Sequence, residues 1–264
     1  MSGSRAVLIV ALVAATAIGA DAQRRGRFSP SVRMAAPDDV DGAYHFCRVA
    51  YRSGGWGVDY PRADINLSIR LSELTKTRVS FDASDEPNHL VVRLIDDALF
   101  QCPFVMMTEV GGTYLDDDEV VRLREYLLKG GFLWADDFWG SYAWQTWEGE
   151  IRKVFPASEY PIVQLSVDHP LFRTHFVVKK VPQIPSINYW MGSGGDTSER
   201  GPDSAIPTAR AIFDSTGRMM VLMTHNTDLG DSWEREGDDP NYFYHFAVDG
   251  YAVGINVVIY SMTH

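Results

Sequence analysis

Two acidic side chains, Asp136 and Asp137, follow directly after an apolar segment, in the stretch GGFLWADDFWG at residues 130–140. Successive residues of a strand point to opposite faces, so the two carboxylates cannot play the same part. We expect one to face a crevice and the other to cap a following turn. We favour Asp137 in the crevice because it lies furthest beyond the strand. The alternative is that both accept hydrogen bonds from the backbone of the following turn.

Other residues with chemical potential also follow apolar or glycine-rich segments. Glu109 ends the run PFVMMTEV, whereas Trp56 and Asp64 lie in and after the loop RSGGWGVDYPRAD. In open, doubly wound sheets, ligands bind beyond the carboxyl ends of the strands, near the point where the strand order reverses. A flavodoxin-like order would bring these three residues and the aspartate pair into one crevice. Clustered carboxylates repel each other, so one would have a raised pKa unless a cation or an arginine compensates.

Tryptophans and a histidine are further candidates for ligand binding. Trp139 could form an aromatic platform for a sugar ring together with Trp56, and Trp144 and Trp147 lie near the same expected end of the sheet. The alternative is that these rings cover the ends of the sheet. His169 precedes a proline in DHPLF, which favours an extended, exposed position. It is a candidate base or ligand, or a histidine without a chemical role.

An acidic segment follows the predicted strand that ends at His225 and Asn226. Asp228, Asp231 and Glu234 come next, with a spacing that weakly resembles an oxygen-ligand cation loop. We interpret this segment as a solvated acidic turn, and keep Asn226 as a candidate ligand-binding residue. No zinc signature, phosphate-binding glycine loop with lysine, or G-x-S-x-G elbow is present, so motifs identify no cofactor and no metal.

The elements that must position these residues alternate between strands and helices. Strands are predicted at 43–51, 78–82, 103–110, 132–137 and 162–167, and helices at 65–77, 115–131, 147–156 and 246–264. Asp64 is the predicted N-cap of the first helix. Residues 183–210 form an irregular insertion, and 210–225 a hairpin. Unbroken apolar strands alternating with helices predict an α/β fold with a mostly parallel sheet covered on both faces.

The N-terminal segment and the charge indicate a location and exclude one class of partner. Residues 1–22 have the three regions of a secretory signal peptide, 23–41 form a polar tether, and 42–264 a single domain, so we expect a periplasmic or secreted protein that is not integral to the membrane after cleavage. Removing Arg5 and Asp21 takes away one charge of each sign and leaves the net charge of −11 unchanged. This acidic surface disfavours nucleic acid as a partner.

We interpret Cys47 and Cys102 as small buried hydrophobes, with a disulfide as the alternative.

Five blocks of the sequence, in order, resemble the bacterial domain-of-unknown-function family 4159. They are YPRADINLSIRLSELT, FVMMTEVGGTYLDDDEVVRLREYLLKGGFLWADDFWGS, IRKVFP, DHPLF and NTDLGDSWE. The resemblance implies a flavodoxin-like fold similar to the class I glutamine amidotransferases, and no established activity. In those enzymes the strand after a glycine pair leads to a nucleophilic cysteine, and here Asp136 or Asp137 stands at that place. Glutamine hydrolysis by the usual mechanism is therefore disfavoured.

Three functions remain open at this point. The first is a binding module of the cell envelope for a small molecule or an envelope protein. The second is a hydrolase, perhaps acting on glycans, in which Asp137 and Glu109 serve as base and acid while Trp56 and Trp139 hold a sugar. The third is a cation site formed by Asp136 or Asp137 with Glu109.

Overall fold

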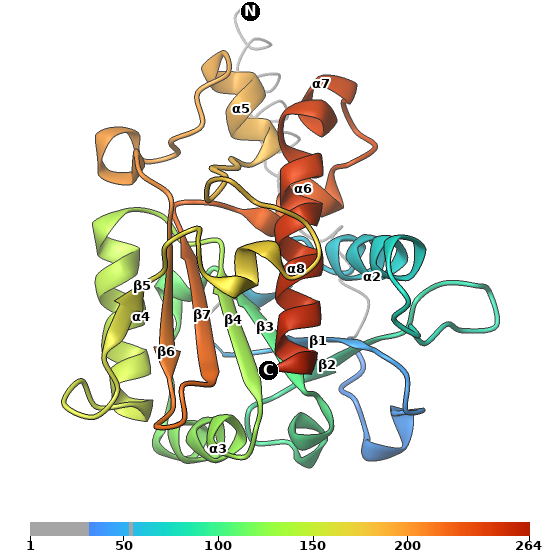
Figure 1. Cartoon of the computed structure of the whole chain (residues 1–264), viewed down its shortest axis with the longest axis vertical. Helices are drawn as coiled ribbons and strands as arrows, with labels where there is room; N and C mark the ends of the chain where they lie inside the picture. The colour runs from blue at the N-terminus through green and yellow to red at the C-terminus, as the bar shows by residue number, and fades with distance from the viewer. Residues whose placement is uncertain (1–31, 53–54) are drawn as a thin grey trace, which may run out of the picture. The chain divides into compact units, whose positions relative to one another are not determined.

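The computed structural model describes residues 32–52 and 55–264 of the chain. Residues from Met34 to His264 form one compact unit, which is shown in Figure 1. The predicted signal peptide and residues 23–31 of the predicted tether lie outside the described residues. The later part of the tether joins the folded unit, because the Ala35 amide donates a hydrogen bond to the carbonyl of Val91 over 2.8 Å.

A seven-stranded, mostly parallel sheet forms the centre of the unit. Its strands are β1 (Phe46–Val49), β2 (His89–Val92), β3 (Phe104–Thr108), β4 (Phe132–Asp136), β5 (Ile162–Gln164), β6 (Thr208–Phe213) and β7 (Met219–His225). Their order across the sheet is β2-β1-β3-β4-β7-β6-β5. The pairs from β2 to β7 are parallel, and β6 runs antiparallel to both of its neighbours. After β2 the chain crosses to the other side of β1 to form β3, so the strand order reverses between β1 and β3.

Helices cover both faces of this sheet (Figure 1). The helices are α2 (Arg62–Leu74), α3 (Asp117–Leu128), α4 (Gly140–Val154), α5 (Ile187–Ser193), α6 (Leu229–Glu234), α7 (Pro240–Tyr242) and α8 (Val248–Thr263). Leu67 of α2, Trp233 of α6 and Val257 of α8 belong to one apolar core. Leu123 of α3 and Trp147 of α4 belong to the other. The predicted mixed α/β fold with a mostly parallel sheet is thus confirmed.

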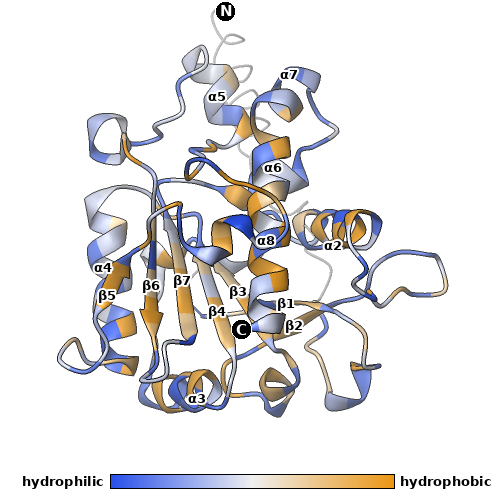
Figure 2. Cartoon of the chain, in the orientation of Figure 1, coloured by the Kyte–Doolittle hydropathy of each residue, from blue (hydrophilic) through white to orange (hydrophobic). Residues whose placement is uncertain are grey.

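The hydropathy pattern explains this layering. The central strands β3, β4 and β7 are apolar along their length, and α2 has one apolar and one polar side (Figure 2). Every residue of these three strands is buried, as expected for strands packed between two helical layers. Helix α3 begins with a capping box in which Asp116 accepts from the amide of Glu119 and the Glu119 carboxylate accepts from the amide of Asp116.

Three sequence-based expectations about the elements were wrong. Residues 78–82 form isolated bridges, at Val79 and Phe81, and the second strand is instead His89–Val92. Helix α4 begins at Gly140, before the predicted start at Trp147. The segment read as irregular contains the short helix α5.

Cys47 and Cys102 are joined in a disulfide bond, so their interpretation as free thiols was wrong. The bond links β1 to the segment that precedes β3, across a sequence separation of 55 residues. Both cysteines are buried in the core that includes α3 and α4. The bond therefore links β1 to the start of β3, the two neighbouring strands between which the strand order reverses.

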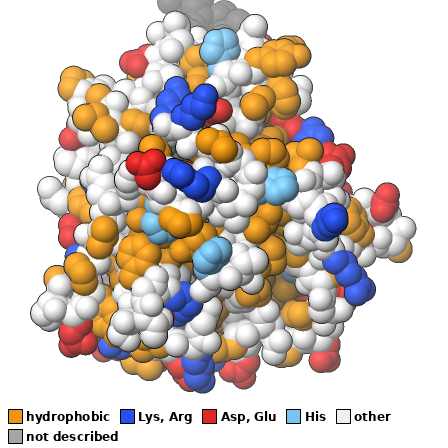
Figure 3. Space-filling view, in the orientation of Figure 1, with side chains coloured by type: hydrophobic (Ala, Val, Ile, Leu, Met, Phe, Trp, Pro, Cys, Tyr) orange, Lys and Arg blue, Asp and Glu red, His pale blue; other side chains and the backbone are white. Residues whose placement is uncertain are grey.

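The C-terminal helical segment Pro240–Thr263 is long and apolar enough to span a membrane, by length and composition alone. Within the folded unit, 61% of its most apolar window is buried, and core helices of globular proteins meet the same criterion. In the view of Figure 3, apolar side chains are seen across the middle of the face over α8, and acidic side chains lie mostly toward its rim.

Candidate functional site: carboxylates at the strand ends

Four polar residues at the carboxyl edge of the sheet have left-handed backbone conformations. Glu109 directly follows β3, Asp137 follows β4 and Asn226 follows β7, with φ values of 48°, 55° and 62°. Asp59, in the loop that leads from β1 to α2, has a φ of 63°. Such conformations are unfavourable for residues other than glycine and gather at functional sites. Three strand ends and one loop therefore have strained polar residues at the same edge of the sheet.

A pocket of about 330 Å³ lies in this region. It is lined by Gly55, Glu109, Gly111, Gly112, Asp137, Phe138, Trp139, Ala143, Glu199 and Arg200. Gly55 is required by a close approach, because a Cβ atom at this position would lie 1.9 Å from Oε2 of Glu109. Of the residues predicted from the sequence, Glu109, Asp137 and Trp139 are thus brought together in one pocket.

Burial in this pocket raises the pKa values of two of its acids, Glu109 and Asp137. Burial raises the pKa of Glu109, and the nearby Glu199 raises it further. Burial raises the pKa of Asp137 well above its usual range, and the charges of Asp59, Asp136 and Glu109 add to that effect. Arg200 lies 3.9 Å from the carboxylate of Glu199 and is the one basic side chain among the described residues of the lining. Acids therefore outnumber bases in the pocket.

Asp136 has a different environment from its neighbour Asp137. Its two oxygens accept hydrogen bonds from the hydroxyl of Thr224 and from the amide of Leu229, the first residue of α6. Burial raises its pKa to about 7, although these hydrogen bonds act in the opposite direction. Asp136 thus holds the start of α6 against β4, and Asp137 is the member of the pair that lines the pocket.

Asp64 forms a buried ion pair, and the prediction that it caps α2 was wrong. The helix begins at Arg62, after Pro61, and Asp64 lies in its first turn. Nε of Arg48 donates to both carboxylate oxygens of Asp64 at 3.0 Å, and neither side chain is exposed to solvent. Nη1 of Arg48 also donates to Thr108 and to the carbonyls of Trp56 and Val58. Asp64 therefore positions the loop between β1 and α2.

Asn226 and His169 have side chains engaged in local contacts. The amide oxygen of Asn226 accepts from the amide of Gly140 over 2.8 Å, and its nitrogen donates to the carbonyl of Ile206 over 2.9 Å. It thereby satisfies the amide of Gly140, the buried first residue of α4. His169 lies at the opposite edge of the sheet, because its ring contacts Phe213, which pairs with the first residue of β7, and Tyr260. The structure does not bring His169 to the pocket.

The tryptophans differ in their distance from the pocket. Trp139 lines it and donates from Nε1 to Oδ1 of Asp137 over 3.0 Å. Trp56 packs against the core and against Tyr60, with ring centroids 5.7 Å apart. Trp144 stacks on Phe138, and Trp147 is fully buried.

A group of buried acids that sequence reasoning missed lies beside the pocket. Asp59, Asp137 and Asp228 each offer an oxygen within 4.8 Å of the other two, and Asp59 also lies near Asp231 and Glu234. The interpretation of 228–234 as a solvated turn was wrong, because Asp228 and Asp231 are 3% and 5% exposed. The spacing of these acids was a usable signal for a cation site. Nothing in the sequence around Asp59 indicates that it joins them.

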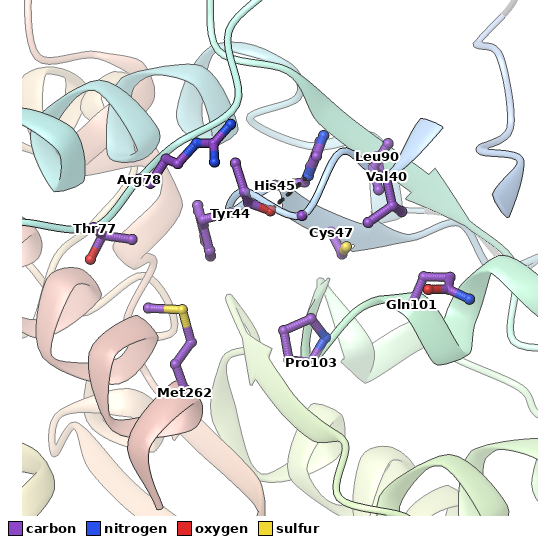
Figure 4. A pocket seen from close by; sticks show the side chains of 12 residues that line it. Val40, Tyr44, His45, Cys47, Thr77, Arg78, Leu90, Gln101, Pro103 and Met262 are labelled. Atoms are coloured by element: carbon purple, nitrogen blue, oxygen red, sulfur yellow. Dashed lines mark hydrogen bonds between the residues drawn. The ribbon is translucent and has the colours of Figure 1, made fainter. Parts of the chain in front are cut away.

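A second cavity, of about 370 Å³, lies near the start of β1 and the end of α8 (Figure 4). Tyr44, Leu90, Pro103 and Met262 are among the side chains that line it. Nδ1 of His45, another lining residue, forms a hydrogen bond with the carbonyl of Ala43 over 3.2 Å. This cavity contains none of the carboxylates described above, and it provides sites for control variants.

We expect His225, beside the start of α4, to make stability fall at acidic pH. Its Nε2 hydrogen bonds to the carbonyl of Gly140 over 3.0 Å, and burial, followed by the nearby Arg210, lowers its pKa. A lowered folded-state pKa means that the unfolded chain binds the proton more tightly, so stability is lost as pH falls below about 6.5. Urea denaturation between pH 5 and pH 8 should show a steeper loss for wild type than for His225→Gln. An equal dependence of the free energy of unfolding on pH in the two proteins would contradict the role assigned to His225.

The fold and the site together define an α/β protein in which buried carboxylates meet at the carboxyl edge of a mostly parallel sheet. Residues 45–262 match the model of the family described as a domain of unknown function, DUF4159. The match covers most of the chain, which therefore belongs to this family, as the sequence blocks predicted. A comparison with curated proteins finds no match.

Proposed function

We propose that this protein is a ligand-binding module of the cell envelope, built on an amidotransferase-like scaffold without the nucleophilic cysteine. The observation that carries the proposal is the pocket shared by Glu109 and Asp137 at the carboxyl ends of β3 and β4. Ligand sites of doubly wound sheets occur at this edge, near the reversal of strand order. A volume of about 330 Å³ suits a small molecule.

Strand order supports the flavodoxin-like part of this proposal. When β7 is counted as the fifth parallel strand, the parallel part of the sheet has the order 2-1-3-4-5, with the reversal between β1 and β3. The two cysteines are joined to each other, so within the described chain neither offers a thiol for glutamine hydrolysis. The disulfide also supports an oxidising compartment, in agreement with the signal-peptide pattern of residues 1–22.

The charges of the pocket favour a small polar ligand that carries a positive charge. Glu109, Asp137 and Glu199 line it together with Arg200 alone as a basic residue. Trp139 adds an apolar surface beside the acids. An amino sugar, a diamine or a basic amino acid has the size and charge that this lining would bind.

Ligand binding is tested by thermal shift and titration calorimetry of the full chain with glucosamine, putrescine, lysine and, as a neutral probe, glucose. We expect at least one cationic probe to bind wild type. Glu109→Gln should weaken its binding by at least about tenfold, because a charge-assisted hydrogen bond is lost.

The matched control is Gln101→Ala, in the cavity near the start of β1, which should bind as wild type does. Failure of every probe to bind, or equal binding by Glu109→Gln, would contradict the proposal.

A hydrolase is the second candidate, and one observation favours it. Glu109 and Asp137 line the same pocket and both have raised pKa values, so one carboxyl could remain protonated and act as an acid while the other acts as a base. Incubation of wild type with aryl glycosides of amino sugars separates the two functions. Turnover that is lost in both Glu109→Gln and Asp137→Asn would favour the hydrolase, whereas binding without turnover favours the module.

A further inference from the structure

Three aspartates from separate parts of the chain converge beside the pocket. Asp59 comes from the loop before α2, Asp137 follows β4, and Asp228 precedes the first residue of α6. They are 6%, 7% and 3% exposed. One oxygen of each lies within 4.8 Å of those of the other two. Loops that bring three carboxylates this close inside a protein must compensate their repulsion.

Hydrogen bonds satisfy this cluster only in part. Oδ1 of Asp137 accepts from Nε1 of Trp139, and Oδ1 of Asp228 accepts from the amide of Asp231 over 2.8 Å. Oδ2 of Asp59 is buried and receives no hydrogen bond from any described residue. A buried polar atom without a partner is rare and costly in a folded protein. Asp59, one of the three clustered aspartates, thus has a buried oxygen that a bound ligand would satisfy.

Basic side chains do not neutralise the cluster. Arg48, a fully buried cation, forms its ion pair with Asp64, and its charge acts on Asp59 only against the larger, opposite effect of burial. Among the described residues, no lysine or arginine forms an ion pair with Asp59, Asp137 or Asp228. The neighbouring acids differ in this respect, because Arg235 lies 3.6 Å from Asp231 and 2.7 Å from Glu234. The three aspartates therefore meet without a directly paired basic side chain among the described residues.

We propose that Asp59, Asp137 and Asp228 bind a divalent metal ion. Three carboxylates are hard oxygen ligands, which suit Ca²⁺, Mg²⁺ or Mn²⁺, and the absence of histidine and cysteine from the cluster disfavours Zn²⁺. Oxygen atoms that all lie within 4.8 Å of one another can surround Ca²⁺, Mg²⁺ or Mn²⁺. Water would complete the coordination.

The metal site lies next to the pocket and shares one residue with it. Its three carboxylates do not require an organic ligand in the pocket. Asp137 belongs to both the cluster and the pocket lining, whereas Asp59 and Asp228 belong to the cluster alone. The metal site goes beyond the proposed function, and it can be tested on protein to which no organic ligand has been added.

The test is titration calorimetry of the full chain, stripped with EDTA, with CaCl₂, MgCl₂ and MnCl₂. We expect wild type to bind one equivalent of at least one of these ions. Asp59→Asn and Asp228→Asn should weaken the Kd by at least about tenfold. Gln101→Ala, in the cavity near the start of β1, should change it by less than about twofold.

Circular dichroism confirms that each variant is folded, and anomalous diffraction from wild-type crystals soaked in MnCl₂ provides a measurement that needs no variant. A peak between the three carboxylates supports the site. Absence of binding by wild type, unchanged affinity in both aspartate variants, or a peak only elsewhere would overturn it. A Glu109→Gln protein that no longer binds the organic probe but still binds one equivalent of metal ion would separate the two proposals.

Discussion

Replacing Asp64 by alanine is expected to lower the free energy of unfolding by about 3–5 kcal/mol, as measured by urea denaturation followed by circular dichroism. The substitution leaves the guanidinium of Arg48 buried at 0% exposure without its carboxylate. Hydrogen bonds from Arg48 to the carbonyls of Trp56 and Val58 would remain, but they do not neutralise its charge.

Asp168→Ala is the matched control for this variant. Asp168 pairs with Arg173 over 3.0 Å, but the two side chains are 88% and 53% exposed. Water screens such a pair, so the control should unfold close to wild type. The double variant Arg48→Met, Asp64→Leu should recover part of the loss, since it removes the unpaired charge. A loss for Asp64→Ala no larger than that of the control would contradict the role assigned to Arg48 and Asp64.

Removing the disulfide is expected to lower the free energy of unfolding by about 2–4 kcal/mol, because the bond closes a long loop in the unfolded chain. Cys47 and Cys102 are separated by 55 residues and are both buried. The double variant Cys47→Ala, Cys102→Ala should show this loss in urea denaturation under oxidising conditions.

Dithiothreitol provides the control for the disulfide. The reductant should lower the stability of wild type to near that of the double variant, and should leave the double variant unchanged. Mass spectrometry after alkylation reports whether the bond has been reduced. Equal stability of reduced and oxidised wild type would contradict the expected contribution of the bond.

Much of the sheet could be predicted from the sequence because its central strands are unbroken apolar runs. Phe104–Thr108, Phe132–Asp136 and Met219–His225 all fall within predicted segments. The strand His89–Val92 was missed because a polar, turn-rich stretch precedes it, and burial there comes from its pairing with β1. The start of α4 was missed because Asn226, 86 residues away in sequence, accepts the hydrogen bond of the Gly140 amide.

Only those residues of the candidate site whose positions follow from the strand order could be predicted from the sequence. Parallel strands end at one edge, so Glu109 and Asp137 could be expected to lie close together from the order of elements. The burial of Asp59 and Asp228 depends on how two loops pack, and the sequence around them resembles that of exposed turns. Asp64 is an aspartate only five residues after Asp59, and only the position of Arg48 reveals its structural role.

The most direct test of the claim that the Glu109–Asp137 pocket is the functional site is a crystal structure of the full chain soaked with the tightest-binding probe of the cationic set. We predict electron density for the probe in this pocket, with its positively charged group at the carboxylates of Glu109 and Asp137. Density confined to the cavity near the start of β1, or density in neither cavity, would contradict the claim.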